Sequence, residues 1–122
     1  MKFKFIVAGI FSTMLLTACQ STLTERLTPT ADKETVEEAR HALAAYEEFD
    51  IDDDGTITLV QTLPEGYHWL PHITKKIGLE VSCDNLRYFV DKGMVVAIHY
   101  KGARGRFDQY DSNRCIELEQ DL

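Results

Sequence analysis

The sequence has no long hydrophobic run, no excess of basic residues and few cysteines. Its longest mostly apolar stretch, residues 5–16, has about 12 residues, fewer than the ~20 that a membrane-spanning helix needs. Lys and Arg number 13 against 20 Asp and Glu, so the net charge of −7 argues against nucleic acid as the main partner. There is also no Ser/His/Asp spacing, phosphate-binding glycine loop or nucleotide fingerprint. We therefore predict a protein that is not an enzyme.

The N-terminus has the pattern of an export signal. A short basic segment, Met1-Lys2-Phe3-Lys4, precedes the apolar stretch, which ends in Leu16-Thr17-Ala18-Cys19. This ending resembles the lipobox of bacterial lipoproteins, in which an aliphatic residue and two small ones precede the lipidated cysteine. The resemblance implies acyl chains on Cys19 that anchor the chain in the bilayer. Because Gln20 is not the aspartate associated with inner-membrane retention, it also implies an outer-membrane location.

The alternative for this segment is an ordinary signal peptide that contains a cysteine. The lipoprotein interpretation divides the chain into three parts. We expect a signal peptide over 1–18, a lipid-anchored flexible tether over 19–31, rich in Ser and Thr, and a single domain over 32–122.

Lipidation of Cys19 would leave an even pair, Cys83 and Cys115, in an oxidising compartment such as the periplasm. A bridge between them would close a loop of about 32 residues and contribute roughly 3–4 kcal/mol to stability. We predict this disulfide; the alternative is a catalytic thiol that works with a histidine.

The rest of the pattern predicts an α+β fold, in which an N-terminal helix packs on a small antiparallel β-sheet (a meander) with one disulfide. Val36, Ala39, Leu43 and Tyr46 recur at helical spacing and predict a helix over 35–48, with Thr35 and Glu38 at capping-box spacing. Pro71 can begin a short helix that Gly78 would end, with Ile73 and Ile77 pointing inward. Strand-like segments then follow at 79–83, 86–90, 94–100, 106–110 and 114–118.

One segment carries a chemical motif. Asp50-Ile51-Asp52-Asp53-Asp54-Gly55-Thr56 continues to Gln61 and resembles the twelve-residue calcium loop of EF-hands. The resemblance implies calcium as a possible cofactor, with Asp50, Asp52, Asp54, Thr56 and Gln61 as ligands.

Three features depart from the EF-hand pattern. Gln61 replaces the bidentate glutamate, Pro64 would cut short the exiting helix, and residues 56–61 have strand propensity. The alternative is an acidic turn between a helix and a strand, for which three aspartates and a glycine suffice.

Weaker signals complete the set. Lys101, Arg104 and Arg106 form a basic cluster that would contact an anionic partner, such as lipid A phosphates, an acidic glycan or an acidic protein face, or would serve only as a charged hairpin tip. His68 and His72 have a spacing that suits zinc on a helix, but Pro71 argues against a continuous helix.

Together these signals predict a small lipoprotein of the outer membrane, facing the periplasm or the surface. We expect a non-catalytic binding or structural accessory module whose partner is an envelope protein. One alternative is a calcium-binding lipoprotein stabilised or regulated by the loop at 50–61, and another is an inhibitor or immunity protein against an envelope-acting enzyme. Weak hydrolytic activity is a third.

Overall fold

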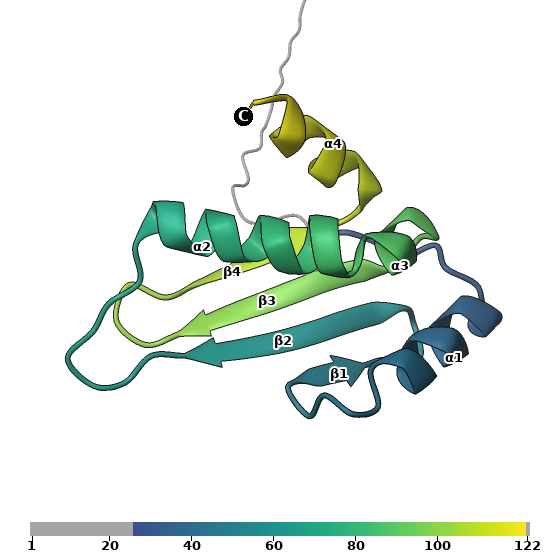
Figure 1. Cartoon of the computed structure of the whole chain (residues 1–122), viewed down its shortest axis with the longest axis horizontal. Helices are drawn as coiled ribbons and strands as arrows, with labels where there is room; N and C mark the ends of the chain where they lie inside the picture. Colours follow the sequence, from purple (N-terminus) through teal and green to yellow (C-terminus); the bar gives the residue numbers. More distant parts are fainter. Residues whose placement is uncertain (1–25, 122) are drawn as a thin grey trace, which may run out of the picture.

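A computed structural model describes residues 26–121, so the predicted signal peptide, Cys19 and Gln20 lie outside the described residues. The described chain folds into a four-stranded sheet and helices, which confirms the α+β class (Figure 1). The elements, in order, are α1 (Lys33–Ala42), β1 (Phe49–Ile51), β2 (Thr56–Thr62), α2 (Pro71–Gly78), the π-helical segment η1 (Leu79–Asn85), α3 (Arg87–Asp91), β3 (Val95–Lys101), β4 (Arg106–Tyr110) and α4 (Ser112–Gln120).

The strands lie in the order β1-β2-β3-β4. The outer pairs, β1 with β2 and β3 with β4, are antiparallel, whereas the central pair β2 and β3 is parallel. A parallel pair needs a long crossover, and here the crossover consists of α2, η1 and α3. The expected antiparallel meander is therefore wrong for the central pair, although antiparallel pairing dominates the sheet.

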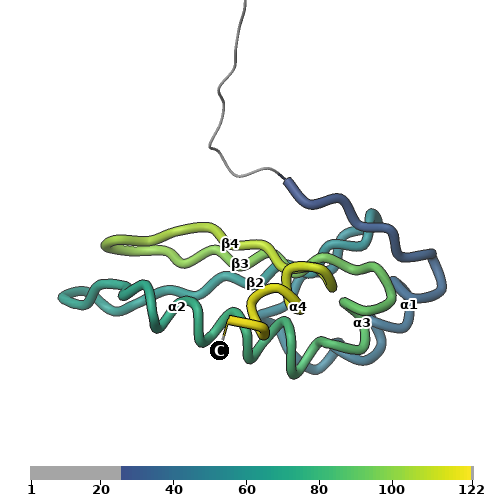
Figure 2. Tube along the Cα trace, turned by 90° about the horizontal axis from the view of Figure 1, so that it is seen from above, coloured from purple at the N-terminus to yellow at the C-terminus, as the bar shows by residue number. Residues whose placement is uncertain are grey.

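The crossover covers one face of the sheet, which we call the helical face. Figure 2 shows α2 and α3 on one side of the strands and the chain that leads into α1 on the other. Side chains of alternate residues point to the helical face, and Ile57, Leu59, Val96, Ile98 and Tyr110 from β2, β3 and β4 are buried in the core there. Leu86, Phe89 and Val90 pack against this core from the helices.

Two predicted strands belong to this crossover and are helical. Leu79, Val81 and Cys83 alternate as in a strand, yet η1 carries them, and α3 carries most of 86–90. Helix α2 ends at Gly78 as predicted, but the backbone stays helical there, because Gly78 has a helical φ of −59° and the chain passes directly into η1. The helix does begin at Pro71 as predicted, but Ile73 is exposed rather than inward.

Helix α1 is shorter than the predicted 35–48. It begins at Lys33, because the Asp32 carboxylate accepts the Thr35 N–H at 2.9 Å, and ends at Ala42. That hydrogen bond is the main reason why the pKa of Asp32 is below its usual value. Val36 and Ala39 of this helix, with Leu43 just beyond it, reach the core as the stripe predicts, whereas Tyr46, the last residue of the stripe, is exposed.

Helix α4 replaces the strand predicted over 114–118. The Asp111 carboxylate accepts the Arg114 N–H at 2.8 Å and so caps the helix. Cys115, fully buried, forms the predicted disulfide with Cys83 and ties α4 to η1.

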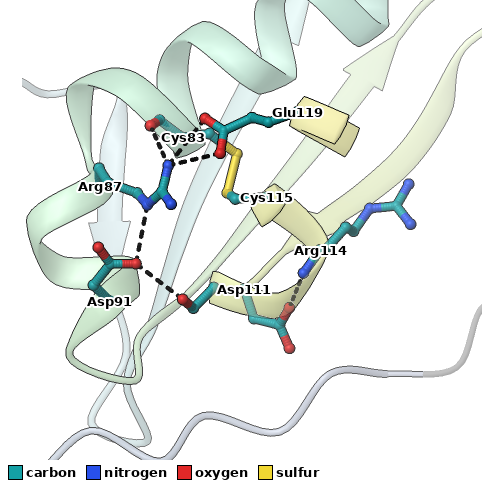
Figure 3. The surroundings of a disulfide bond; sticks show 8 residues. Cys83, Arg87, Asp91, Asp111, Arg114, Cys115 and Glu119 are labelled. Atoms are coloured by element: carbon teal, nitrogen blue, oxygen red, sulfur yellow. Dashed lines mark hydrogen bonds and ion pairs between the residues drawn. A yellow bond between two sulfur atoms is a disulfide. The ribbon is translucent and has the colours of Figure 1, made fainter. Parts of the chain in front are cut away.

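A network of polar contacts surrounds this bridge (Figure 3). Arg87 forms ion pairs with Asp91 at 3.0 Å and with Glu119 at 3.0 Å, and Ser112 donates a hydrogen bond to Asp91. The contact with Arg87 lowers the pKa of Asp91, and the Ser112 hydroxyl adds to the effect. Helix α4 is thus held by a covalent bond, by the ion pair of Glu119 with Arg87 and by the hydrogen bond of Ser112 with Asp91.

Candidate functional site

The sheet has a second face, opposite the helical face, which we call the open face. Strand alternation and register place two rows of side chains there: Asp50, Thr58, Ala97 and Gln109 in one, and Val60, His99 and Phe107 in the other. Within the described residues, this face is covered only in part, and Val60 is exposed there. Half-exposed His99 packs on Phe107 with ring centroids 4.5 Å apart.

Residues 26–31, which we call the strap, lie across part of the open face. The Leu27 N–H donates to the Gln109 side chain at 3.0 Å, and the N–H groups of Thr30 and Ala31 both donate to the Gly93 carbonyl, at 2.8 and 3.1 Å. These bonds attach the last six residues of the predicted tether to the domain. Residues 26–31 thus lie against the domain, and a flexible tether over 19–31 stays a prediction.

Two glycines make room for the strap. Gly55 and Gly93 have φ values of +104° and +101°, in the left-handed region that favours glycine. A Cβ on Gly55 would lie 3.0 Å from the Pro29 Cβ, and one on Gly93 would overlap the backbone of Ala31. The close approach of the strap thus depends on these two positions.

Beside the strap the open face is hollowed. The hollow has a volume of about 330 Å³, and its lining includes Leu27 and Pro29 from the strap and Thr58, His99 and Phe107 from the sheet. The lining combines hydroxyl, imidazole, amide and carboxylate groups with the ring of a phenylalanine. The hollow therefore offers hydrogen-bond donors, hydrogen-bond acceptors and an apolar surface. The sequence did not predict this site. The alternation of residues in 56–62 indicates that the strand has two faces, but it does not indicate which face the strap crosses or how much of that face stays uncovered.

The predicted calcium ligands are divided between the two faces. Asp52, Asp54 and Thr56 line the hollow on the open face. Asp50 projects from the same face as its register partner Thr58, whereas Gln61 follows the core residues Ile57 and Leu59 in the alternation and lies on the helical face. The structure therefore does not bring Gln61 together with the aspartates.

The segment 50–61 forms a β-hairpin, with β1 and β2 joined by a turn. The Asp52 N–H donates to the Thr56 carbonyl at 2.9 Å, and the Thr56 N–H donates to the Asp54 carboxylate at 3.0 Å. Arg40 of α1 binds Asp53 at 2.6 Å and the Ile51 carbonyl at 3.2 Å. These contacts are those of an acidic turn that α1 holds in place, and calcium binding stays a prediction.

Within residues 26–121, no three His, Cys, Asp or Glu side chains lie together so as to hold a metal ion. His68 lies before α2, bridged to Ala103, and His72 is the second residue of that helix, so one continuous helix does not carry both.

The basic cluster lies at one end of the sheet, around the turn between β3 and β4. Lys101, Arg104 and Arg106 are all exposed there, as the predicted turn requires. Arg106 forms an ion pair with the buried carboxylate of Asp108 at 2.9 Å, and the Lys101 carbonyl accepts the Trp69 indole N–H at 2.9 Å.

Comparison of the chain with known proteins gives no match. No family model matches it, and neither the curated proteins nor the solved structures give a match. Among the helices of residues 26–121, none has the length and apolar character needed to cross a membrane.

Proposed function

We propose that this protein is a lipid-anchored, non-catalytic binding module of the bacterial outer membrane that holds an envelope protein on the open face of its sheet. The anchor is the lipobox-like cysteine, Cys19. The observation that carries the proposal is the half-covered open face, with exposed Val60 beside the His99–Phe107 pair and the hollow next to them.

Several properties of this face support a protein partner. It combines an aliphatic side chain, two rings and hydrogen-bonding groups over neighbouring strands, a mixture typical of protein interfaces. The strap leaves the domain from the same face, since Leu27 is bonded to Gln109 of β4. The strap therefore forms one wall of the hollow, and a partner bound in the hollow would contact both the strap and the strands of the sheet.

Photocrosslinking in the native envelope tests the open face. A benzophenone amino acid replaces Val60, which is 43% exposed on the open face, or Ile116, which is 44% exposed on α4 and serves as the matched control. We expect an adduct of one defined mass from the Val60 variant and none from the Ile116 variant. Equal adducts at both positions, or none at either, would contradict the proposal.

Metabolic labelling tests the anchor separately. A fatty acid analogue is expected to label the wild-type chain and to leave Cys19→Ser unlabelled, because the acyl chains attach to that cysteine. Label that persists in Cys19→Ser would refute the anchor while leaving the crosslinking result intact. Identification of the crosslinked partner from its peptides by mass spectrometry then distinguishes a structural envelope protein from an enzyme that this chain inhibits.

A further inference from the structure

One end of the molecule concentrates positive charge and exposed apolar side chains. It consists of the connection from β2 to α2, the start of α2 and the turn between β3 and β4, which lie together at the left of Figures 1 and 2. We call residues 63–76 and 101–106 the basic tip.

Trp69 joins the two halves of the basic tip. Its backbone N–H donates to the Ala103 carbonyl at 3.0 Å, and its indole N–H donates to the Lys101 carbonyl at 2.9 Å. The buried Trp69 ring also meets Tyr100 edge-on, with centroids 4.9 Å apart. These contacts hold the two segments of the basic tip together, so the exposed residues on either side of Trp69 have fixed positions relative to the turn between β3 and β4.

The exposed side chains of the basic tip are of two kinds. Tyr67, at 66% exposure, with Leu70 and Ile73 supplies the apolar part. The basic part has four exposed cations, Lys75, Lys76, Lys101 and Arg104, together with exposed Arg106, whose charge is paired with the buried carboxylate of Asp108. The same two segments hold one acid, Glu65, although the whole chain has a net charge of −7. Leu70, Arg104 and Arg106 line one hollow of about 310 Å³, so the two kinds are interleaved.

We propose that the basic tip lies on the surface of a bilayer that contains anionic phospholipid, with Tyr67 among the headgroups. Cations attract the anionic headgroups, and aromatic and aliphatic side chains among them enter the boundary between headgroups and acyl chains. The basic tip protrudes at the end of the sheet, as a surface that enters a fluid interface must. The inference rests on the anchor in the proposed function, since the anchor keeps the domain at the membrane.

The length of the chain between the anchor and the strap permits this contact. Six residues, 20–25, separate Cys19 from Arg26, and a chain of that length spans at most about 25 Å. The strap is fixed at Gln109, and Arg106 is three residues away on β4, about 10 Å along the strand. An anchored domain thus has its basic tip within reach of the bilayer.

Fluorescence quenching by lipid tests the proposal on the full exported chain, purified from membranes and reconstituted into vesicles with brominated acyl chains. The indole introduced by Tyr67→Trp is expected to lose about half of its emission in phosphatidylcholine vesicles that contain phosphatidylglycerol, because interfacial side chains lie about 5–10 Å deep. Wild type supplies the baseline for the buried Trp69. Tyr46→Trp is the matched control, since Tyr46 is 53% exposed but lies in the acidic segment between α1 and β1.

Salt and charge reversal test the electrostatic part. Quenching of Tyr67→Trp is expected to fall to the baseline at about 0.5 M NaCl, in pure phosphatidylcholine, and when Lys76→Glu and Arg104→Glu are added. No quenching in anionic vesicles, equal quenching in Tyr46→Trp, or quenching that persists in pure phosphatidylcholine would each overturn the proposal. The mass of the purified chain reports the lipid on Cys19, and the Val60 crosslink reports the open face, so the failure of either is distinguished from failure of the basic tip.

Discussion

The substitution Gly78→Ala tests the packing of the crossover on the sheet. Gly78 is buried where α2 passes into η1, directly over Tyr110 of β4. A Cβ at this position would overlap the Tyr110 hydroxyl and the adjoining ring carbons. Tyr110 cannot move aside easily, because it is 1% exposed and paired with Val96 in the sheet.

Two effects of opposite sign decide the outcome. In an exposed helix, replacing glycine by alanine would stabilise the fold by about 1 kcal/mol. Overpacking a rigid core costs about 1–3 kcal/mol. Because the added Cβ would overlap both the hydroxyl and the ring carbons of Tyr110, we expect the cost of Gly78→Ala to lie near the upper end of this range. The net loss is then about 2 kcal/mol, which lowers the Tm of a domain of this size by roughly 8–16 °C.

Thermal and urea denaturation of Gly78→Ala, Tyr110→Phe and the double variant measure this loss. Tyr110→Phe removes the oxygen that a Cβ on Gly78 would meet first, so Gly78→Ala should cost about 1 kcal/mol less in that background. A Gly78→Ala variant with an unchanged or higher Tm would refute the reasoning. Strict additivity in the double variant would show that the loss has another origin.

Three further outcomes are expected. Replacing Cys83 and Cys115 by alanine should lower the free energy of unfolding by roughly 3–4 kcal/mol, from a loop of 32 residues, and a loss below about 1 kcal/mol in urea denaturation would contradict this. Arg87 and Ser112 hold the pKa of Asp91 below its usual 3.8, so the stability that ionised Asp91 contributes is present above pH 3.8 and is lost as the pH falls further. Asp91→Asn should therefore make the decline of Tm in acid shallower. An unchanged decline would count against the pairing of Asp91 with Arg87. Asp54→Ala should lower the Tm equally with calcium and with chelator, because the carboxylate caps the Thr56 N–H; a calcium-induced rise in wild type that Asp54→Ala abolishes would instead assign the ion to the loop.

Local signals in the sequence predicted those elements whose pattern has only one structural solution. The almost continuously apolar run 94–100 predicts a strand, and β3 spans Val95–Lys101 with a strand paired on each side. Pro71 begins α2 because its fixed φ suits the first turn and its missing N–H is not needed there. The even number of cysteines left beside Cys19, with the expectation of export to an oxidising compartment, likewise predicted the bond between Cys83 and Cys115.

The sequence misled where a short apolar run fits two periods. Leu79, Val81 and Cys83 alternate, but Leu79, Cys83, Leu86 and Val90 also recur at helical spacing, and packing on the sheet selects the second pattern. Asp111 lies between the segments 106–110 and 114–118, both predicted as strands, and the structure shows that it caps α4. The open face could not be predicted, because its outline depends on the hydrogen bond between Leu27 and Gln109, 82 residues apart.

The position of the strap relates the proposed anchor to both proposed surfaces. The chain enters the domain at Gln109, on the open face, and reaches Gly93 at the other end of β3 from the basic tip. A lipid anchor that joins the domain near Gln109 limits the distance of the domain from the bilayer. It does not by itself orient the domain, since a single tether allows rotation. A second contact at the basic tip would remove that freedom, because two points fix the long axis of the sheet relative to the membrane. The open face would then be presented to a partner in one orientation, which lowers the entropy lost when the partner binds.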